Sequence, residues 1–336
     1  MLNKDIKLNQ KLFFDDVEQV PIRKGFGEGL VAAGEADKNV VALSADLTES
    51  TQMEAFKNAF PDRFIEIGVA EQNLVTVGSG MAALGKIPFV SSYAMFSPGR
   101  NWEQIRTTIA YNDRPVVIVG SHAGISVGPD GGTHQAVEDM AIMRVMPNMM
   151  VISPCDAIEA RKATIALAKL ATEGKGKPAY LRLMREKTPI MTTDATPFEI
   201  GKANIMYRPD GIAHVGIIAT GALVHKAMWA AKKLEKDGIR AVVMNIHTIK
   251  PLDTQAIIAL ARETKAIVTA EEHQIAGGLG GAIAEALASS LPTPIEFIGV
   301  HDKFGQSGKP EELLKHYKMT MEDIMEAAKK VLGRKN

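Results

Sequence analysis

The sequence is poor in cysteine and in aromatic residues, and it carries no net charge. Its one cysteine, Cys155, excludes an internal disulfide and a multi-cysteine zinc site. The 39 basic and 39 acidic residues balance, so nothing electrostatic indicates a nucleic acid or an anionic membrane as partner. No apolar run approaches the ~18–20 residues that span a bilayer, and the opening MLNKDIKLNQ contains no apolar signal core. We therefore expect a soluble, cytoplasmic protein with no nucleic-acid partner and no membrane association.

The apolar segments of the first half predict a parallel sheet. Hydrophobic residues make up 46% of the 336, an ordinary globular composition, and the length suggests about two domains. Short apolar runs alternate with helix-like stretches. The runs are residues 40–46, 63–69, 87–93, 115–122, 150–156 and 179–185, and the helix-like stretches include 71–84, 100–112, 135–145 and 156–171. Continuous apolar strands that alternate with helices are typical of a parallel sheet covered on both faces.

The second half repeats this alternation. Its apolar runs are residues 214–221, 240–248, 265–273 and 295–301, and a final helix is expected near 320–333. The segment between the two series contains prolines and has little periodicity. We therefore predict an α/β protein with two doubly wound domains and mainly parallel sheets. The domains would be residues 15–190 and 213–336, joined by a linker at 191–212.

Polar and aromatic side chains follow the predicted strands of the first half. In open α/β sheets, ligands bind beyond the carboxyl ends of the strands. The residues there are Asp46, Ser50, Glu71, Tyr93, His122 and Arg185. Because loops that follow strands are often polar in any case, this set alone does not identify a site.

The segment SHAGISVGPDGGTHQ, residues 121–135, is the most unusual part of the chain. Asp130 lies eight residues after His122, and His134 lies four residues further on. A loop so rich in glycine is costly to order, and one reason to keep it is the close approach of backbone to a ligand. Histidine is also the natural proton carrier near neutral pH. We favour a functional loop over a flexible surface loop.

Other candidates allow two readings each. Glu71 opens a helix and could be a first-turn carboxylate stabilised by the helix dipole. Tyr93 and Phe96 could stack on a flat ring or belong to the core. The residues Arg23, Ser50 and Arg185 could bind a phosphate or lie on the surface. The GGLGG segment at 277–281 does not complete a dinucleotide fingerprint and could be close helix–sheet packing or an anion-binding turn.

Together, three segments resemble the pyrimidine-binding and C-terminal portion of transketolases. They are SADLTES (44–50), RFIEIGVAEQNLVTVGSGMA (63–82) and HAGISVGPDGGTHQAVEDMA (122–141). The resemblance extends from about Arg23 into the final domain. It implies the pyrimidine-binding fold of thiamine-diphosphate enzymes, followed by a transketolase C-terminal domain.

The resemblance implies roles around the cofactor. Glu71, in GVAEQ, would hydrogen-bond N1′ of the aminopyrimidine of thiamine diphosphate, and Tyr93 and Phe96 would pack on that ring. Asp46 and Leu47 match positions near the cofactor. A third aromatic residue of the family is replaced by SPGR at 97–100, and the usual Gly-Pro before the threonine of GGTHQ is Gly-Gly here.

The resemblance also implies a substrate site. His134 would lie near the reacting carbonyl, and Asp130 would read a substrate hydroxyl. The site for the substrate phosphate would consist of Arg23, Ser50, His122 and Arg185.

One half of a complete transketolase has no counterpart in this sequence. Whole transketolases begin with a diphosphate-binding domain, marked by Gly-Asp-Gly and a later asparagine pair, and the nearest string here is PDGG at 129–132. Hard cations need such oxygen ligands. The resemblance therefore implies the C-terminal subunit of a split transketolase. A separate N-terminal subunit would carry Mg²⁺ or Ca²⁺ and the diphosphate site, and the assembly would be a heterotetramer.

The implied activity is transfer of a two-carbon ketol unit from a ketose phosphate to an aldose phosphate, as in the pentose phosphate pathway. The nearest alternative is the β-subunit of a 2-oxoacid dehydrogenase E1 component, which has two such domains and a similar glutamate. Half of a 1-deoxyxylulose-5-phosphate synthase is disfavoured, because that family tends to have arginine where His122 stands. A non-catalytic regulatory subunit on the same fold is the remaining alternative.

Overall fold

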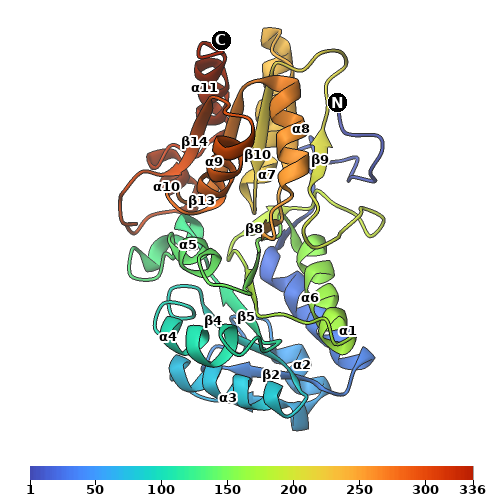
Figure 1. Ribbon diagram of the computed structural model, residues 1–336, viewed down its shortest axis with the longest axis vertical. Helices are drawn as coiled ribbons and strands as arrows, with labels where there is room; N and C mark the ends of the chain where they lie inside the picture. The colour runs from blue at the N-terminus through green and yellow to red at the C-terminus, as the bar shows by residue number, and fades with distance from the viewer. Residues whose placement is uncertain (336) are drawn as a thin grey trace.

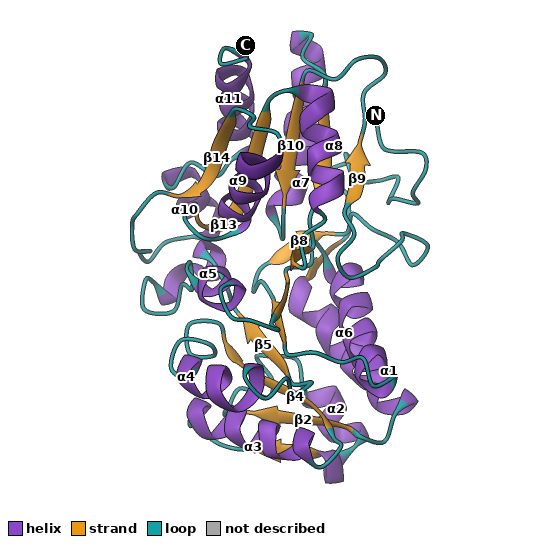
Figure 2. Cartoon of the chain, in the orientation of Figure 1, coloured by secondary structure: helices purple, strands orange, loops and turns teal. Residues whose placement is uncertain are grey.

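Two sheets, one mainly from each half of the chain, organise the fold (Figure 1). The structure is a computed structural model and describes residues 1–335. Helices lie on both faces of each sheet, as Figure 2 shows. The predicted α/β class with mainly parallel sheets is confirmed.

The first sheet has seven strands, six of them from the first half of the chain. These are β2 (Val40–Ser44), β3 (Phe64–Glu66), β4 (Ile87–Tyr93), β5 (Val117–Ser121), β6 (Met150–Ile152) and β7 (Ala179–Arg182). They run parallel in the order β6-β7-β5-β4-β2-β3. Every residue of β2, with the sequence VVALS, is buried, as expected for a strand covered on both faces.

Helices of the first half pack on this sheet. They are α1 (Ile22–Ala36), α2 (Glu54–Ala59), α3 (Glu71–Ala83), α4 (Trp102–Gln104), α5 (Asp139–Arg144) and α6 (Ala157–Thr172). Helix α6 begins after Asp156, whose side chain accepts a hydrogen bond from the backbone N–H of Glu159 and so satisfies a free donor of the first turn. A short antiparallel pair, β1 (Gln19–Pro21) with β8 (Lys187–Pro189), joins the two ends of this half.

The second sheet has five strands in the order β14-β13-β10-β11-β9. They are β9 (Asn204–Tyr207), β10 (Val215–Ala219), β11 (Ala241–Asn245), β13 (Ile267–Gln274) and β14 (Ile295–Val300). All pairings are parallel except that of β9 with β11. The helices are α7 (Leu223–Leu234), α8 (Thr254–Thr264), α9 (Leu279–Ser290), α10 (Pro310–His316) and α11 (Met321–Leu332). Among the helices of residues 1–335, none is both long and apolar enough to cross a membrane.

The two halves interlock through a strand that the sequence did not reveal. Strand β12 (Thr248–Lys250) belongs to the second half but pairs antiparallel with β6, at the edge of the first sheet. The ammonium group of Lys250 donates to the backbone carbonyls of Arg144 and Met146. The buried cores are continuous as well, since Ile125 packs with the core of the second half. The two halves therefore behave as one packed body.

Two predicted segments differ in detail. Residues 191–212 were expected to be a linker, but they include β9, which pairs with β11 and extends the second sheet. Residues 100–112 were expected to be one helix. Only α4 is an α-helix there, and residues Ile105–Ala110 continue as a π-helix (η2).

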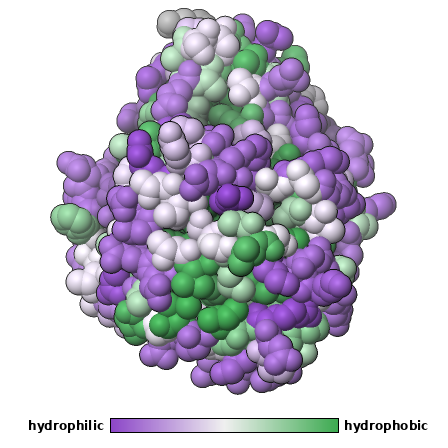
Figure 3. All heavy atoms as spheres, turned by 60° about the horizontal axis from the view of Figure 1, so that its bottom comes forward, coloured by the Kyte–Doolittle hydropathy of each residue, from purple (hydrophilic) through white to green (hydrophobic). Residues whose placement is uncertain are grey.

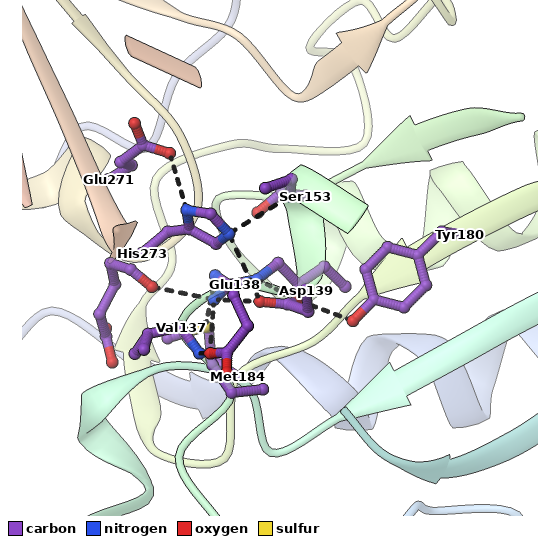
Figure 4. Close-up of polar contacts among 12 residues, drawn as sticks. Val137, Glu138, Asp139, Ser153, Tyr180, Met184, Glu271 and His273 are labelled. Atoms are coloured by element: carbon purple, nitrogen blue, oxygen red, sulfur yellow. Dashed lines mark hydrogen bonds and ion pairs between the residues drawn. The ribbon is translucent and has the colours of Figure 1, made fainter. Parts of the chain in front are cut away.

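A buried polar network joins the halves (Figure 4). Asp139 at the start of α5 accepts hydrogen bonds at 2.7 Å from Tyr180 Oη and from Arg182 Nε, both on β7. Arg182 also donates to the backbone carbonyl of Glu272 on β13, at 2.9 Å. Burial opposes ionisation of Asp139, but Arg182 and His273 hold its pKa below the usual value. The pKa of His273 is lowered to about 4 by burial, so this network contains one ion pair and a neutral histidine at neutral pH.

Candidate functional site

The carboxyl edge of the first sheet brings together most of the predicted site residues. Tyr93 ends β4, His122 follows β5, and Asp46 follows β2. Arg185 follows β7, and Arg23 lies in the first turn of α1. His122 and Asp46 have left-handed backbones, with φ of 58° and 60°. Such conformations are costly for residues with a side chain and cluster at functional sites.

Four aromatic rings form a row at this edge. The Tyr93 ring stacks on His122 with 3.9 Å between centroids, and it lies nearly parallel to Phe96 at 6.2 Å. The rings of Phe96 and His134 meet in a T-shaped arrangement, with 5.2 Å between their centroids. The row thus joins residues that are predicted to contact the cofactor to residues that are predicted to contact the substrate.

Two arginines flank His122. Arg23 donates from Nη1 to the backbone carbonyl of Arg185, and its buried Nε has no hydrogen-bond partner among residues 1–335. Arg185 donates to the carbonyl of Val127 at 2.7 Å and lies 3.6 Å from a carboxylate oxygen of Asp130. Burial, reinforced by the two guanidinium charges, lowers the pKa of His122 to about 3. His122 is therefore neutral at physiological pH, and the positive charge of this corner comes from the arginines.

Glu71 is the first residue of α3, and its side chain is buried. Its carboxylate accepts hydrogen bonds from Ser92 Oγ at 3.2 Å and from Arg100 Nη1 at 2.9 Å. Asn101 Nδ2 donates to the backbone carbonyl of Glu71 at 2.8 Å. A surface groove lined by Val69, Ala70, Glu71, Arg100 and Gln104, among others, opens beside it.

Arg100 was missed by sequence reasoning. Its guanidinium lies over the Phe96 ring, 4.1 Å from the centroid, while it pairs with Glu71. The signal that could have found it is the spacing, because Arg100 follows Phe96 by four residues in the same turn. Glu66 was also missed. It accepts hydrogen bonds from the backbone N–H of Asp46 at 2.6 Å and from Thr48 Oγ1 at 2.9 Å, and so shapes the turn after β2.

Asp46, Leu47 and Ser50 take no part in the contacts among Arg23, His122 and Arg185. Asp46 is exposed, and Leu47 is half-buried with its backbone N–H donating to Ser44 Oγ at 3.2 Å. Ser50 lies in the following turn, half-buried, outside the contacts that join Arg23, His122 and Arg185. Among residues 1–335, no group of three or more histidine, cysteine, aspartate or glutamate side chains is arranged to hold a metal ion.

The GGLGG segment encloses a side chain of the protein itself. The Glu271 carboxylate accepts hydrogen bonds at 2.7 Å from the backbone N–H groups of Leu279 and Gly280, at the start of α9. A Cβ on Gly278 would lie 2.0 Å from a Glu271 oxygen, so glycine is required there. Burial raises the pKa of Glu271 to about 7 although these bonds lower it. The anion-binding turn is therefore filled from within the chain.

Comparison with known proteins gives the same assignment for both halves. The sequence profile of the transketolase pyrimidine-binding domain matches residues 18–191, and that of the transketolase C-terminal domain matches residues 201–324. A "Putative transketolase C-terminal section" from Methanocaldococcus jannaschii is 44% identical over 90% of this chain and 93% of the relative. A 6-deoxy-6-sulfo-D-fructose transketolase subunit from Clostridium sp. (strain MSTE9) is 38% identical over 95% of this chain and 97% of that subunit.

A solved structure is similar over nearly the whole chain. It is described as "Split gene transketolase, inactive beta4 tetramer" and superposes with a TM-score of 0.86 at 40% identity, covering 94% of this chain and 100% of that one. The fold and the two matching profiles define a protein built from a transketolase pyrimidine-binding domain and a transketolase C-terminal domain. The chain belongs to the transketolase family, within which it is the C-terminal part of a split transketolase.

Proposed function

We propose that this chain, joined to a separate N-terminal subunit, forms a transketolase that moves a two-carbon ketol unit from a ketose phosphate to an aldose phosphate. The observation that carries the proposal is the continuous contact from Phe96 through Tyr93 to His122, with Arg23 and Arg185 at its end. It joins an aromatic surface suited to a flat ring to a cationic corner suited to a terminal anion. The pentose phosphate pathway is the corresponding place in metabolism.

The residues around Glu71 fit the pyrimidine half of thiamine diphosphate. A buried carboxylate is a suitable partner for N1′ of the aminopyrimidine, and Glu71 is buried beside the exposed side chain of Arg100 and the open groove. Tyr93 and Phe96 supply aromatic contact, while Asp46 and Leu47 border the pocket. When bound, thiamine diphosphate supplies the carbon nucleophile of ketol transfer. Glu71 orients that group and holds or releases a proton at N1′.

The other residues act on the sugar. Arg23 and Arg185 bind the terminal phosphate, and neutral His122 adds a hydrogen bond between them. Ser50 would complete this corner from the turn after β2. Asp130 accepts a hydrogen bond from a substrate hydroxyl, and His134 moves a proton at the reacting carbonyl. The remote phosphate thereby orients the carbonyl end of the substrate.

The partner would complete the cofactor site and hold Mg²⁺ or Ca²⁺ through the diphosphate motif that this sequence lacks. Self-association is supported by the segments that flank α3, where Val69 is 68% exposed and Leu84 is 86% exposed. Figure 3 shows apolar residues gathered on the face of the molecule formed by its first half. We propose that this face and the second half build a heterotetramer with two copies of each subunit.

The test is a ketol-transfer assay on the complex that co-purifies with this chain from its native cells. It is supplied with thiamine diphosphate, Mg²⁺, xylulose 5-phosphate and ribose 5-phosphate, and glyceraldehyde 3-phosphate release is followed. We expect activity that requires the co-purifying subunit. Turnover of 2-oxoacids in its place would overturn the proposal in favour of a dehydrogenase subunit. A complex inactive on both substrate classes would favour a regulatory subunit. A parallel arm with a 6-sulfonated ketose separates a phosphate from a sulfonate preference.

A further inference from the structure

The loop that carries Asp130 and His134 packs directly against the second half of the chain. It runs through η3 (Ile125–Asp130) to residue 136 and faces residues 303–308, which precede α10. A Cβ on Gly132 would lie 2.6 Å from the backbone oxygen of Gly305, and one on Gly131 would lie 2.6 Å from Ser307 Oγ. The sequence suggested that these glycines make room for a ligand. The structure shows that they make room for another segment of the chain.

Gln135 fastens this contact. It is buried, and its Nε2 donates to the carbonyls of Ile125 at 3.1 Å, Gly128 at 3.3 Å and Gln306 at 3.0 Å. Two of these carbonyls belong to the loop itself and the third to the facing segment. One amide next to His134 therefore sets the curvature of the loop and ties it to the second half.

The facing segment, residues 303–308, is anchored by side chains of the second half. Gln274, at the end of β13, donates from Nε2 to the carbonyl of Lys303 at 2.8 Å. Tyr317 Oη donates to the carbonyl of Phe304 at 2.8 Å. The segment is thus a fixed template, because its backbone is anchored immediately before the point where it meets the loop.

The other end of the loop is also held by the second half. Glu272 on β13 accepts a hydrogen bond from the backbone N–H of Ser126 at 2.5 Å. Arg182 Nη2 links the carbonyls of Ala136, at 3.3 Å, and Glu272, at 2.9 Å. The start and the middle of the loop therefore bond directly to the second half, and its end is linked to Glu272 through Arg182 of β7.

We infer that the second half is a positioning element for substrate recognition. Residues 303–308 and Gln135 hold Asp130 and His134 in register with the cationic corner at Arg185. This inference rests on the proposed function, since it assigns Asp130 to a sugar hydroxyl. It gives the second half a role in selectivity for the sugar, in addition to any role in assembly.

The variant that tests it is Gly305→Ala. The new Cβ would lie 1.6 Å from Gln135 Oε1 and 3.2 Å from Gln135 Cβ, so the glutamine must move and lose its three bonds. The matched control is Gly281→Ala in α9, because the new Cβ would lie 3.7 Å from Arg144 Nη2, the nearest atom among the described residues. Tyr317→Phe is a milder second variant, because it keeps the ring and removes only the bond to the segment.

The readout is the ratio of kcat/KM for xylulose 5-phosphate to kcat/KM for hydroxypyruvate, measured on the assembled complex. Hydroxypyruvate presents the hydroxyketone end without the further hydroxyl or phosphate. We expect Gly305→Ala to lower the ratio by ~10-fold or more, Tyr317→Phe to lower it less, and the control to leave it unchanged. An equal fall for both donors, or no fall, would overturn the inference.

Hydrogen exchange on the chain alone separates failure of the inference from failure of the proposed function. The backbone N–H groups of His134 and Gln135 donate to Gly131 at 3.0 and 3.2 Å. We expect them to exchange faster in Gly305→Ala and at the wild-type rate in Gly281→Ala. Unchanged exchange in Gly305→Ala would contradict the template role, whatever the enzyme does. A wild-type complex without ketol transfer would contradict only the proposed function and the selectivity built on it.

Discussion

Arg100 donates a hydrogen bond from Nη1 to Oε2 of Glu71 over 2.9 Å, and the two side chains differ sharply in exposure. The Glu71 side chain is 2% exposed, whereas that of Arg100 is 49% exposed. Arg100 is therefore the partner that can leave without disturbing the core. The Arg100 guanidinium also covers the Phe96 ring. A movement of this one side chain would therefore uncover both the Glu71 carboxylate and a face of Phe96.

Replacing Arg100 by alanine should destabilise the chain on its own. A hydrogen bond to a charged group contributes about 1.5–3 kcal/mol, and the exposure of Arg100 reduces this, so we expect a loss of about 1–2 kcal/mol in the free energy of unfolding. Urea unfolding measures it. The control is Arg106→Ala, an exposed arginine nearby on η2, which should stay within about 0.5 kcal/mol of wild type. Equal losses of unfolding free energy in the two variants would show that the ion pair between Arg100 and Glu71 contributes nothing to stability.

Glu71→Ala should remove most of the turnover of the complex while assembly is preserved. Positioned proton transfer contributes ~10²–10⁴-fold, so kcat should fall by that factor. Glu54→Ala, which removes an exposed carboxylate from the first turn of α2, is the matched control and should keep wild-type activity. Light scattering reports the assembly state of each variant. Wild-type activity in the Glu71 variant would remove its role and favour a first-turn carboxylate.

Arg185→Ala should raise KM for phosphorylated sugars with little change in kcat. One charge-assisted hydrogen bond contributes about 1.5–3 kcal/mol, which corresponds to a ~10–100-fold rise in KM. Steady-state kinetics with a ketose phosphate and with an unphosphorylated donor separates this effect from general damage. A similar loss with both donors would place Arg185 outside the phosphate site.

The sequence predicted the parallel sheets and placed Tyr93 and Phe96 as a pair after β4, because these features depend on local patterns. The run IPFVSSY became β4 with its predicted bounds, and the spacing of His122, Asp130 and His134 kept them on one loop. Contacts between distant segments were not predictable in this way. The pairing of β12 with β6 and the bond from Gln135 to the carbonyl of Gln306 each join residues about 100 or more positions apart. Arg100 was overlooked because it pairs with Glu71, which lies 29 positions earlier and has no local pattern in common with it.

The chain without its partner should bind thiamine diphosphate and Mg²⁺ weakly. It offers Glu71 and the aromatic row, whereas the motif for the diphosphate is absent from the sequence. Isothermal calorimetry on the purified chain should give no saturable heat at cofactor concentrations that saturate the complex. Adding the N-terminal subunit should restore stoichiometric binding. Tight binding by the lone chain would refute the division of the cofactor site between two subunits.

His247 should make the stability of the chain decrease in acid. Its side chain is fully buried and stacks on Phe198 with 4.4 Å between ring centroids, and its Nε2 has no hydrogen-bond partner in the part of the chain that the structure describes. Burial lowers its pKa from 6.5 to about 4. Between pH 6.5 and 4, His247 is therefore protonated in the unfolded chain and neutral in the folded chain. The contribution of neutral, buried His247 to the free energy of unfolding is therefore fully present above pH 6.5. It is lost as the pH falls toward 4, at up to about 1.4 kcal/mol per pH unit. Other buried groups titrate in the same range, so the quantity to measure is the difference in the free energy of unfolding between wild type and His247→Phe.

Urea unfolding at several pH values should show that the variant gains stability relative to wild type between pH 6.5 and 4. A constant difference across this range would mean that His247 does not titrate differently in the folded chain.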